Sequence, residues 1–265
     1  MSLEKGWKVV PGSFLLLIVT FLIYYVRYPM WNFSFIEPIF AISFLSYLGV
    51  FLFAVVLLKK DSKKSLSDVF KNKGSLTILI GLLFALLYLG LWYLISYALG
   101  SKIEFGSFGN LRGFENYAVY SLPLALSLYL AFSVFGAFTE EVAYRGYVLT
   151  RISSRYGYVI GIMVSALFFS FQHIHIFQVN WLTQFFQSQF LHVMFFGIFT
   201  GYLYFKSKEN IWSVFSFHVL LNIFSVTVPI IVTQNFQLAY YVAEITSFFV
   251  MILLLRYLPL KNKNP

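Results

Sequence analysis

Long apolar stretches, each about as long as a membrane-spanning helix, follow one another along almost the whole chain. A bilayer core of about 30 Å needs about 20 apolar residues in a helix. Backbone groups in lipid must be satisfied internally, which favours helices for these stretches. The pattern therefore predicts an all-α fold, a polytopic membrane helical bundle of about eight transmembrane helices in one domain over 1–265. The predicted spans are 9–26, 34–58, 75–99, 118–143, 158–177, 182–205, 211–232 and 238–257.

The composition agrees with this pattern. Hydrophobic residues make up 60% of the chain and charged residues 11%, whereas a soluble domain carries roughly 25% charged residues. Membrane lipid is therefore the expected surroundings of the chain. The absence of cysteine excludes disulfides and thiolate chemistry.

The excess of basic residues, which gives a net charge of +9, follows the connections between spans. In a soluble protein it would suggest nucleic acid. Here most lysines and arginines lie at the two termini and in every second connection, which predicts that these parts are cytoplasmic and that no nucleic acid is bound. Both termini are then cytoplasmic, and 59–74 forms a basic cytoplasmic loop. We expect a multi-pass protein of the cell membrane in a prokaryote or of the endoplasmic reticulum in a eukaryote.

A short list of ionisable residues interrupts the apolar stretches. An Asp, Lys or Arg in the middle of a span costs about 2.5–3.5 kcal/mol on insertion scales, so ionisable residues inside spans are functional candidates. All histidines of the chain lie in or beside spans five to seven. Two of the acids, Glu37 and Glu244, have no partner at helical spacing, and we assign them no role. The full set is Glu37, Glu140, Glu141, Arg145, His173, His175, His192, His218 and Glu244.

The end of the fourth span carries two neighbouring glutamates and an arginine. Neighbours on a helix point about 100° apart, so Glu140 and Glu141 cannot share one role. Glu141 and Arg145 stand four residues apart in the favourable acid-before-base order, which predicts an ion pair. Glu140 is not compensated by that pair and is suited to act as a general base for water. The alternative is a charge cluster that snorkels to the cytoplasmic edge.

Two further motifs bring polar groups to the fifth and seventh spans. His173 follows Phe169 by four residues within an apolar helix. His218 and Asn222 have the same spacing and present two polar groups to one point, as an oxyanion site requires. A polar contact between helices explains each motif equally well on its own. Polar groups on three spans favour a water-accessible site in the cytoplasmic half of the membrane. They reach one depth if the fourth span continues as helix to about Thr150 and if the fifth span is tilted or starts later.

The sixth span combines small and polar residues. Gly197 and Gly201 form a GxxxG pair, which predicts close helix packing. The polar residues before them either line an access route for water or peptide or form a plain network between helices. They are Gln184, Gln187, Gln189 and His192.

Three motifs together resemble the CPBP family (CAAX prenyl protease and bacteriocin-processing, also called Abi) of intramembrane endopeptidases. They are Glu140-Glu141-x-x-x-Arg145, Phe169-x-x-x-His173 and His218-x-x-x-Asn222. The motifs cover roughly 139–222, within a catalytic core that we place at 118–232. The resemblance implies a hydrolase that cuts a peptide bond of a membrane-anchored or prenylated protein or peptide, in CAAX-type processing or in bacteriocin and peptide maturation and immunity.

The resemblance also implies roles for the motif residues. Glu140 and His173 would activate water, His218 and Asn222 would stabilise the oxyanion, and Glu141 with Arg145 would support the site. The catalytic type stays open between a glutamic protease and a metalloprotease. In the metalloprotease, Glu140, His173 and His218 would hold a zinc ion with one open position. We favour a mechanism that needs no tightly bound metal.

Two other classes of function also fit intramembrane charges. An ion- or proton-coupled transporter uses such residues along its pathway, although the chain shows neither an internal repeat nor paired broken helices. A non-catalytic membrane immunity or scaffold protein that keeps the family's fold is the second alternative.

Overall fold

A computed structural model describes residues 9–27, 36–62, 66–70, 75–104, 122–173, 190–227, 230–232 and 236–257. Within these ranges, every predicted apolar stretch contains a helix. A helical fold is therefore confirmed. The helices are α1 (Val9–Arg27), α2 (Ile36–Ser62), α3 (Leu66–Val69), α4 (Ser75–Ala98), α5 (Leu122–Glu141), the π-helix η5 (Val142–Leu149), α6 (Thr150–Tyr156), α7 (Tyr158–Phe171), α9 (Phe190–Lys206), α10 (Ile211–Thr227) and α11 (Phe236–Tyr257).

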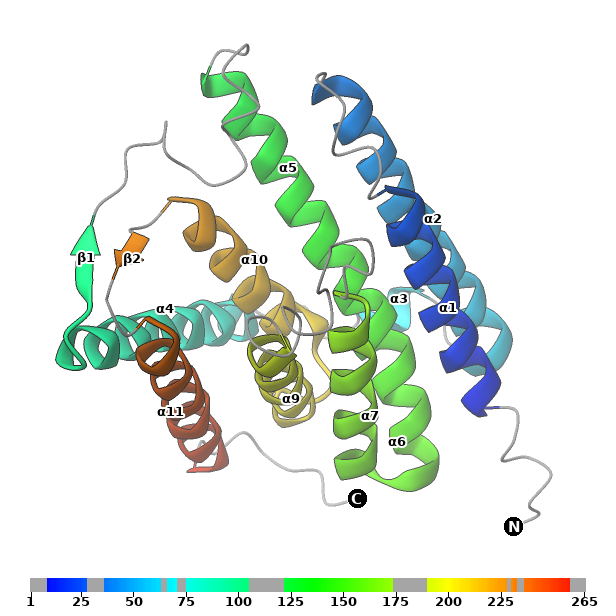
Figure 1. Cartoon of the computed structure of the whole chain (residues 1–265). Helices are drawn as coiled ribbons and strands as arrows, with labels where there is room; N and C mark the ends of the chain where they lie inside the picture. The colour runs from blue at the N-terminus through cyan, green and yellow to red at the C-terminus, as the bar shows by residue number, and fades with distance from the viewer. Residues whose placement is uncertain are drawn as a thin grey trace.

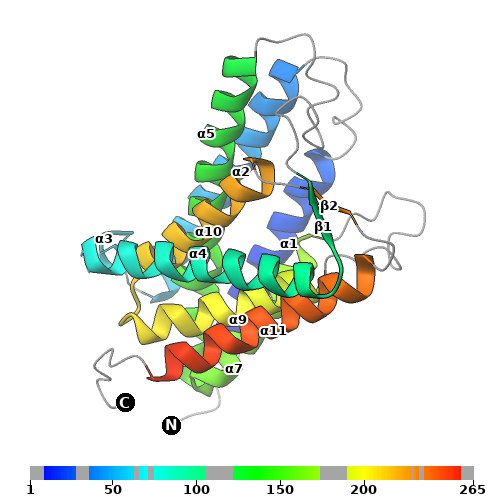
Figure 2. The same cartoon turned by 90° about the vertical axis from the view of Figure 1, so that its left-hand side faces the viewer.

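The helices run in two main directions. Helices α1 and α2 lie side by side along one flank, and α5 lies next to α2 (Figure 1). In the view turned by 90°, α2 and α5 stand upright, whereas α4, α9 and α11 lie across them (Figure 2). Helix α10 packs against α4, α5 and α9 and so joins the two groups.

Among the described residues, three helices are long and apolar enough to cross a membrane. They are Ala41–Lys60, Ser75–Ala98 and Ala239–Tyr257. Four shorter apolar helices accompany them: Pro11–Ile23, Tyr158–Phe171, Phe190–Lys206 and Ile211–Phe224. These helices and the composition indicate a membrane-embedded protein, while the number of spans and the side of the termini remain predictions.

Several boundaries differ from the sequence prediction. The seventh stretch ends as helix at Thr227, and Ile230–Val232 (β2) then pairs antiparallel with Lys102–Glu104 (β1), a short ribbon that the apolar pattern did not predict. Lys59 and Lys60 lie in the last turn of α2 and not in a loop. The predicted basic loop also contains α3, whose Val69 is buried.

Small residues set the closest helix contacts, as the GxxxG pair predicted. A Cβ added at Gly197 would lie 2.8 Å from the Cα of Ala166 on α7, and one at Gly201 would lie 3.2 Å from Ile162. Real Cβ atoms essentially never approach as closely as 2.8 Å. The GxxxG pair therefore allows α9 to pack closely against α7.

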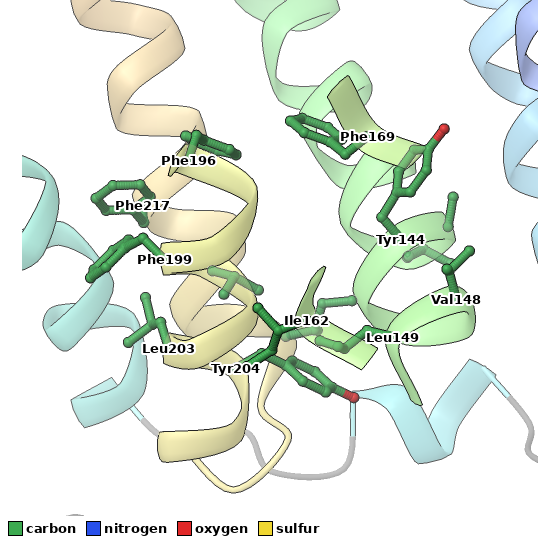
Figure 3. Close-up of a cluster of buried hydrophobic side chains, with 14 of the residues drawn as sticks. Tyr144, Val148, Leu149, Ile162, Phe169, Phe196, Phe199, Leu203, Tyr204 and Phe217 are labelled. Carbon is green, nitrogen blue, oxygen red and sulfur yellow. The ribbon is translucent and has the colours of Figure 1, made fainter. Parts of the chain in front are cut away.

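Aromatic side chains fill the space between α7, α9 and α10. Phe169 and Phe196 stack with ring centroids 5.6 Å apart, and Phe199 lies 4.9 Å from Phe217. Figure 3 shows these rings together with Tyr144 of η5. Close-packed rings of this size are rigid, so they form a fixed wall for polar groups placed next to them.

Candidate active site

The acidic motif lies inside one helical run that continues from α5 through η5 into α6. The helix continues past Thr150 and ends at Tyr156. This continuation is one of the conditions under which the three motifs could form one site. Within η5 the hydrogen-bond pattern widens, which frees backbone carbonyls for other donors. Ser165 of α7 donates to the carbonyl of Tyr144 at 2.9 Å, and Thr150 donates to that of Arg145 at 2.9 Å. The widened turn is therefore held by side chains.

Glu141 and Arg145 form the predicted ion pair, and both are fully buried. Arg145 Nε lies 3.3 Å from Glu141 Oε2. Another nitrogen of the guanidinium, Nη2, donates to the hydroxyl of Thr200 on α9. The guanidinium carbon also lies 4.6 Å from the ring centroid of Phe169, a cation–π distance. Arg145 is thus fixed on three sides and pairs with Glu141 in the interior of the protein.

His218 of α10 lies between the two glutamates. Its Nδ1 contacts Glu141 Oε1 at 2.7 Å, and its Nε2 lies 3.7 Å from Glu140 Oε2. Phe196 flanks the imidazole edge-on, with centroids 4.7 Å apart. The sequence analysis had paired His218 with Asn222, which follows it by one turn of α10 and is half-buried. Contact of His218 with both glutamates was not predicted.

Glu140 is buried next to the ion pair of Glu141 and Arg145. The hydroxyl of Tyr47 on α2 donates to Glu140 Oε1 at 3.3 Å. Tyr47 was not predicted as part of the site, because one tyrosine among 19 does not stand out in the sequence. The only signal available was its place within a long apolar stretch.

His173 lies in the turn just after α7 and not within the helix as predicted. Its Nδ1 contacts the carbonyl of Phe169 at 2.8 Å, which satisfies one of the open carbonyls at the helix end. The centroid of the Phe169 ring lies 4.9 Å from that of His173 and 6.1 Å from that of His218, so the two imidazoles are at most 11.0 Å apart. The first and third motifs are therefore in direct contact through His218, and the Phe169 ring connects His173 of the second motif to them.

Glu244, to which the sequence analysis gave no partner, has two. His192 Nδ1 lies 2.5 Å from Glu244 Oε1, and the hydroxyl of Tyr88 donates to Oε2 at 2.6 Å. The absence of a helically spaced partner was misleading, because both partners come from other helices. The polar residues of the sixth span were predicted either to line an access route or to form a network between helices. His192 contacts a residue of another helix, as such a network requires. The side chain of Glu37 lies outside the described residues, as do His175, Gln184, Gln187 and Gln189.

A zinc ion would need three donors around one centre. Within the described ranges, no three His, Cys, Asp or Glu side chains are grouped closely enough to hold a metal ion. The set of Glu140, His173 and His218 as arranged here therefore does not fit a zinc ion, and zinc binding stays a prediction for experiment.

Comparison with known proteins adds the family. A search of curated proteins finds no match. Residues 122–224 match the family model described as "Type II CAAX prenyl endopeptidase Rce1-like". These residues contain all three motifs, from the glutamates of α5 to Asn222 of α10, and the match supports an intramembrane endopeptidase. Residues 122–224 are therefore similar to the Rce1-like type II CAAX prenyl endopeptidases, in agreement with the CPBP family that the motifs resemble.

Proposed function

We propose that the chain hydrolyses a peptide bond of a membrane-anchored or lipidated protein or peptide, such as a prenylated CAAX-type protein. One observation carries the proposal. Both glutamates of α5 lie beside His218 of α10, at 2.7 Å for Glu141 and 3.7 Å for Glu140, and Arg145 forms an ion pair with Glu141. Glu140 next to an imidazole, with the His173 ring at most 11.0 Å from that imidazole, is a suitable arrangement for activating water.

The proposed reaction uses Glu140 as general base, with His173 orienting the water. The water oxygen bonds to the carbonyl carbon while its proton passes to Glu140. The tetrahedral intermediate then loses its C–N bond, and the same proton passes to the leaving nitrogen. Positioned proton transfer of this kind contributes about 10²–10⁴-fold to the rate.

His218 and Asn222 would donate hydrogen bonds to the oxyanion of that intermediate. The Nδ1 contact with Glu141 at 2.7 Å fixes the orientation of the His218 ring and leaves Nε2 on the side of Glu140. Arg145 in turn fixes Glu141. Glu141 and Arg145 are thus positioning residues, because they act on the substrate only through His218.

A lipid anchor would bring the substrate to this site. An acylated or prenylated peptide stays at the membrane surface and reaches an intramembrane site by lateral movement. In our proposal both termini and the open side of the site face the cytoplasm, as the distribution of lysines predicts. The protein is then a multi-pass enzyme of the cell membrane or the endoplasmic reticulum membrane.

The test is cleavage of a prenylated reporter peptide by purified protein in lipid nanodiscs, with products identified by mass spectrometry. We expect wild-type protein to release the fragment after the prenylated residue and Glu140→Gln to be at least 10³-fold slower, as expected for loss of a general base. The matched control is Glu209→Gln, the same change at an exposed glutamate between α9 and α10. Cleavage by Glu140→Gln at the wild-type rate would overturn the proposal.

A chelator arm separates the two catalytic types. Activity that survives a zinc chelator supports water activation by Glu140, whereas loss that added zinc restores would replace that mechanism by a metal-dependent one. Glu140-dependent ion transport or immunity without cleavage of any anchored peptide would instead favour the transporter or the non-catalytic reading.

A further inference from the structure

The side chain of Gln172, at the end of α7, is buried and has no hydrogen-bond partner. Gln172 is 4% exposed, and among the described residues neither its amide nitrogen nor its amide oxygen is paired. Buried polar groups without a partner are costly, and native proteins leave few of them. The carboxamide therefore indicates a polar ligand that offers both an acceptor and a donor.

The backbone determines the direction in which Gln172 leaves α7. Its φ of −61° and ψ of −21° are helical, and its N–H donates to the carbonyl of Phe168 at 3.2 Å. Helical positions advance by about 100° per residue, so Gln172 lies about 40° from Phe168 and about 60° from Phe169 around the axis. Phe168 packs on Phe14 of α1, and Phe169 packs on Tyr144 of η5. Gln172 therefore leaves α7 between α1 and η5.

Helix α7 runs antiparallel to the helical run from α5 to α6. The chain reverses at Gly157, whose φ of 85° is one that glycine adopts readily. A Cβ added at Gly161 would lie 2.8 Å from the Cβ of Ser153 on α6, whereas Ser165, one turn later, donates to the carbonyl of Tyr144 at 2.9 Å. Each step forward along α7 therefore matches a step backward toward α5.

This register brings Gln172 to the level of Glu140. The rings of Phe169 and Tyr144 meet with centroids 5.3 Å apart (Figure 3). Gln172 follows Phe169 by three residues and Glu140 precedes Tyr144 by four, so both lie about one turn beyond the ring pair in the same direction. Thr139, beside Glu140, is also fully buried, and its hydroxyl is unpaired within the described residues. Unpaired polar groups on both helices therefore lie at the depth of the proposed general base.

We infer that the carboxamide of Gln172 binds the backbone of the substrate peptide beside the scissile bond. The inference rests on the proposed peptidase function and deepens it, because it assigns a residue that holds the peptide in place. In an extended peptide the N–H and C=O of one residue point to the same side, as in a hydrogen-bonded pair of antiparallel strands. A carboxamide matches them, since its NH2 group donates to the carbonyl and its oxygen accepts from the N–H. Binding of this kind selects an extended backbone whatever its side chains.

The test uses prenylated peptides in which one backbone N–H at a time is replaced by an ester oxygen, on either side of a scissile bond that stays an amide. The ester removes the donor and keeps the shape of the chain. For wild-type protein we expect one of these esters to raise KM about tenfold over the all-amide peptide, as for loss of one hydrogen bond. A KM that no ester position changes would overturn the inference.

Gln172→Met removes the carboxamide and keeps an unbranched side chain of similar length. We expect KM for the all-amide peptide to rise about tenfold and the effect of the ester to disappear. The melting temperature should not fall, because the change removes unpaired polar atoms and leaves no partner unsatisfied. An ester effect that persists in Gln172→Met would contradict the inference. A large loss of stability would show that the carboxamide has a partner within the protein, and the inference would then be wrong.

Phe168→Leu is the matched control for packing at the same end of α7. It changes the contact with Phe14 and keeps the carboxamide, so thermal stability should fall while the effect of the ester stays. If Phe168→Leu abolished the ester effect as Gln172→Met does, packing and not the carboxamide would hold the peptide.

A binding measurement separates failure of the inference from failure of the proposed function. Binding of the amide and ester peptides to the Glu140→Gln protein needs no turnover. Absence of cleavage by wild-type protein would overturn the proposed function, whereas equal binding of the amide peptide and every ester peptide would overturn the backbone site alone.

Discussion

Within the described residues, two buried glutamates, Glu141 and Glu244, each pair with a histidine, and the surroundings of the two pairs differ. In each pair the histidine Nδ1 contacts a glutamate oxygen, at 2.7 Å for His218 with Glu141 and at 2.5 Å for His192 with Glu244. The first pair has a second glutamate, Glu140, and a buried arginine beside it. A Glu–His pair by itself packs helices together or orients a side chain. In the proposed mechanism the additional carboxylate, Glu140, is what adds the chemistry.

The largest expected effect on this comparison comes from Arg145→Ala. The change leaves Glu141 buried without its cation, and breaking a buried pair in this way costs about 3–5 kcal/mol. The free energy of unfolding in detergent micelles measures the loss. The control is Arg155→Ala in the last turn of α6, where the side chain is partly exposed, and we expect less than about 1 kcal/mol there. Equal losses in the two variants would contradict the role of the buried pair.

The second-largest effect is expected from Glu141→Gln, which we compare with the same change at Glu244. Glu141→Gln removes the charged partner that orients His218, and a hydrogen bond to a charged group contributes about 1.5–3 kcal/mol. Peptide cleavage should therefore fall about 100-fold. We expect a fall of less than tenfold in Glu244→Gln, because Glu244 contacts no group that acts on the reacting bond. The measurement is the steady-state rate at which the Glu141→Gln and Glu244→Gln proteins cleave the same peptide. A larger loss of cleavage in Glu244→Gln than in Glu141→Gln would contradict the proposed location of the active site.

A smaller effect is expected from Gly197→Ala, which acts on α9, the helix that carries both Thr200 and His192. The new Cβ would approach the backbone of Ala166 to 2.8 Å and push α9 away from α7. Overpacking of this kind costs about 2 kcal/mol. Gly90→Ala on α4 is the matched control, since a Cβ there meets nothing within 4 Å. Thermal unfolding of the two variants provides the measurement, and an unchanged melting temperature for Gly197→Ala would refute the close contact.

The smallest effect should come from Tyr88→Phe, beside the pair of Glu244 and His192. The variant loses the hydrogen bond to Glu244 Oε2 and keeps the ring, which packs on Phe248 with centroids 4.8 Å apart. We expect a loss of about 1.5 kcal/mol in the free energy of unfolding. Denaturant titration in micelles can resolve a change of this size. An unchanged free energy of unfolding would contradict this expectation and would mean that a water molecule takes the place of the lost hydroxyl.

Contacts between groups on one helix were predictable from the sequence, and contacts between helices were not. The ion pair of Glu141 and Arg145 follows from their spacing of four, and the structure confirms it. Thr200, which also holds Arg145, is 55 residues away from it in the chain. Tyr47 is 93 residues from Glu140. Helical periodicity reports the face of one helix and carries no information on which residue of another helix meets that face.

The sequence alone was enough to predict a helical, membrane-embedded protein and to show that all histidines lie in or beside three neighbouring apolar stretches. Apolar length and the cost of charge in lipid are local properties, so the order of the residues expresses them directly. Only the tertiary structure decided that His218 lies between both glutamates and that Glu244 pairs with His192. These contacts depend on the register and crossing of packed helices. The register is determined by close approaches such as Gly197 on Ala166, which form only when the whole bundle assembles.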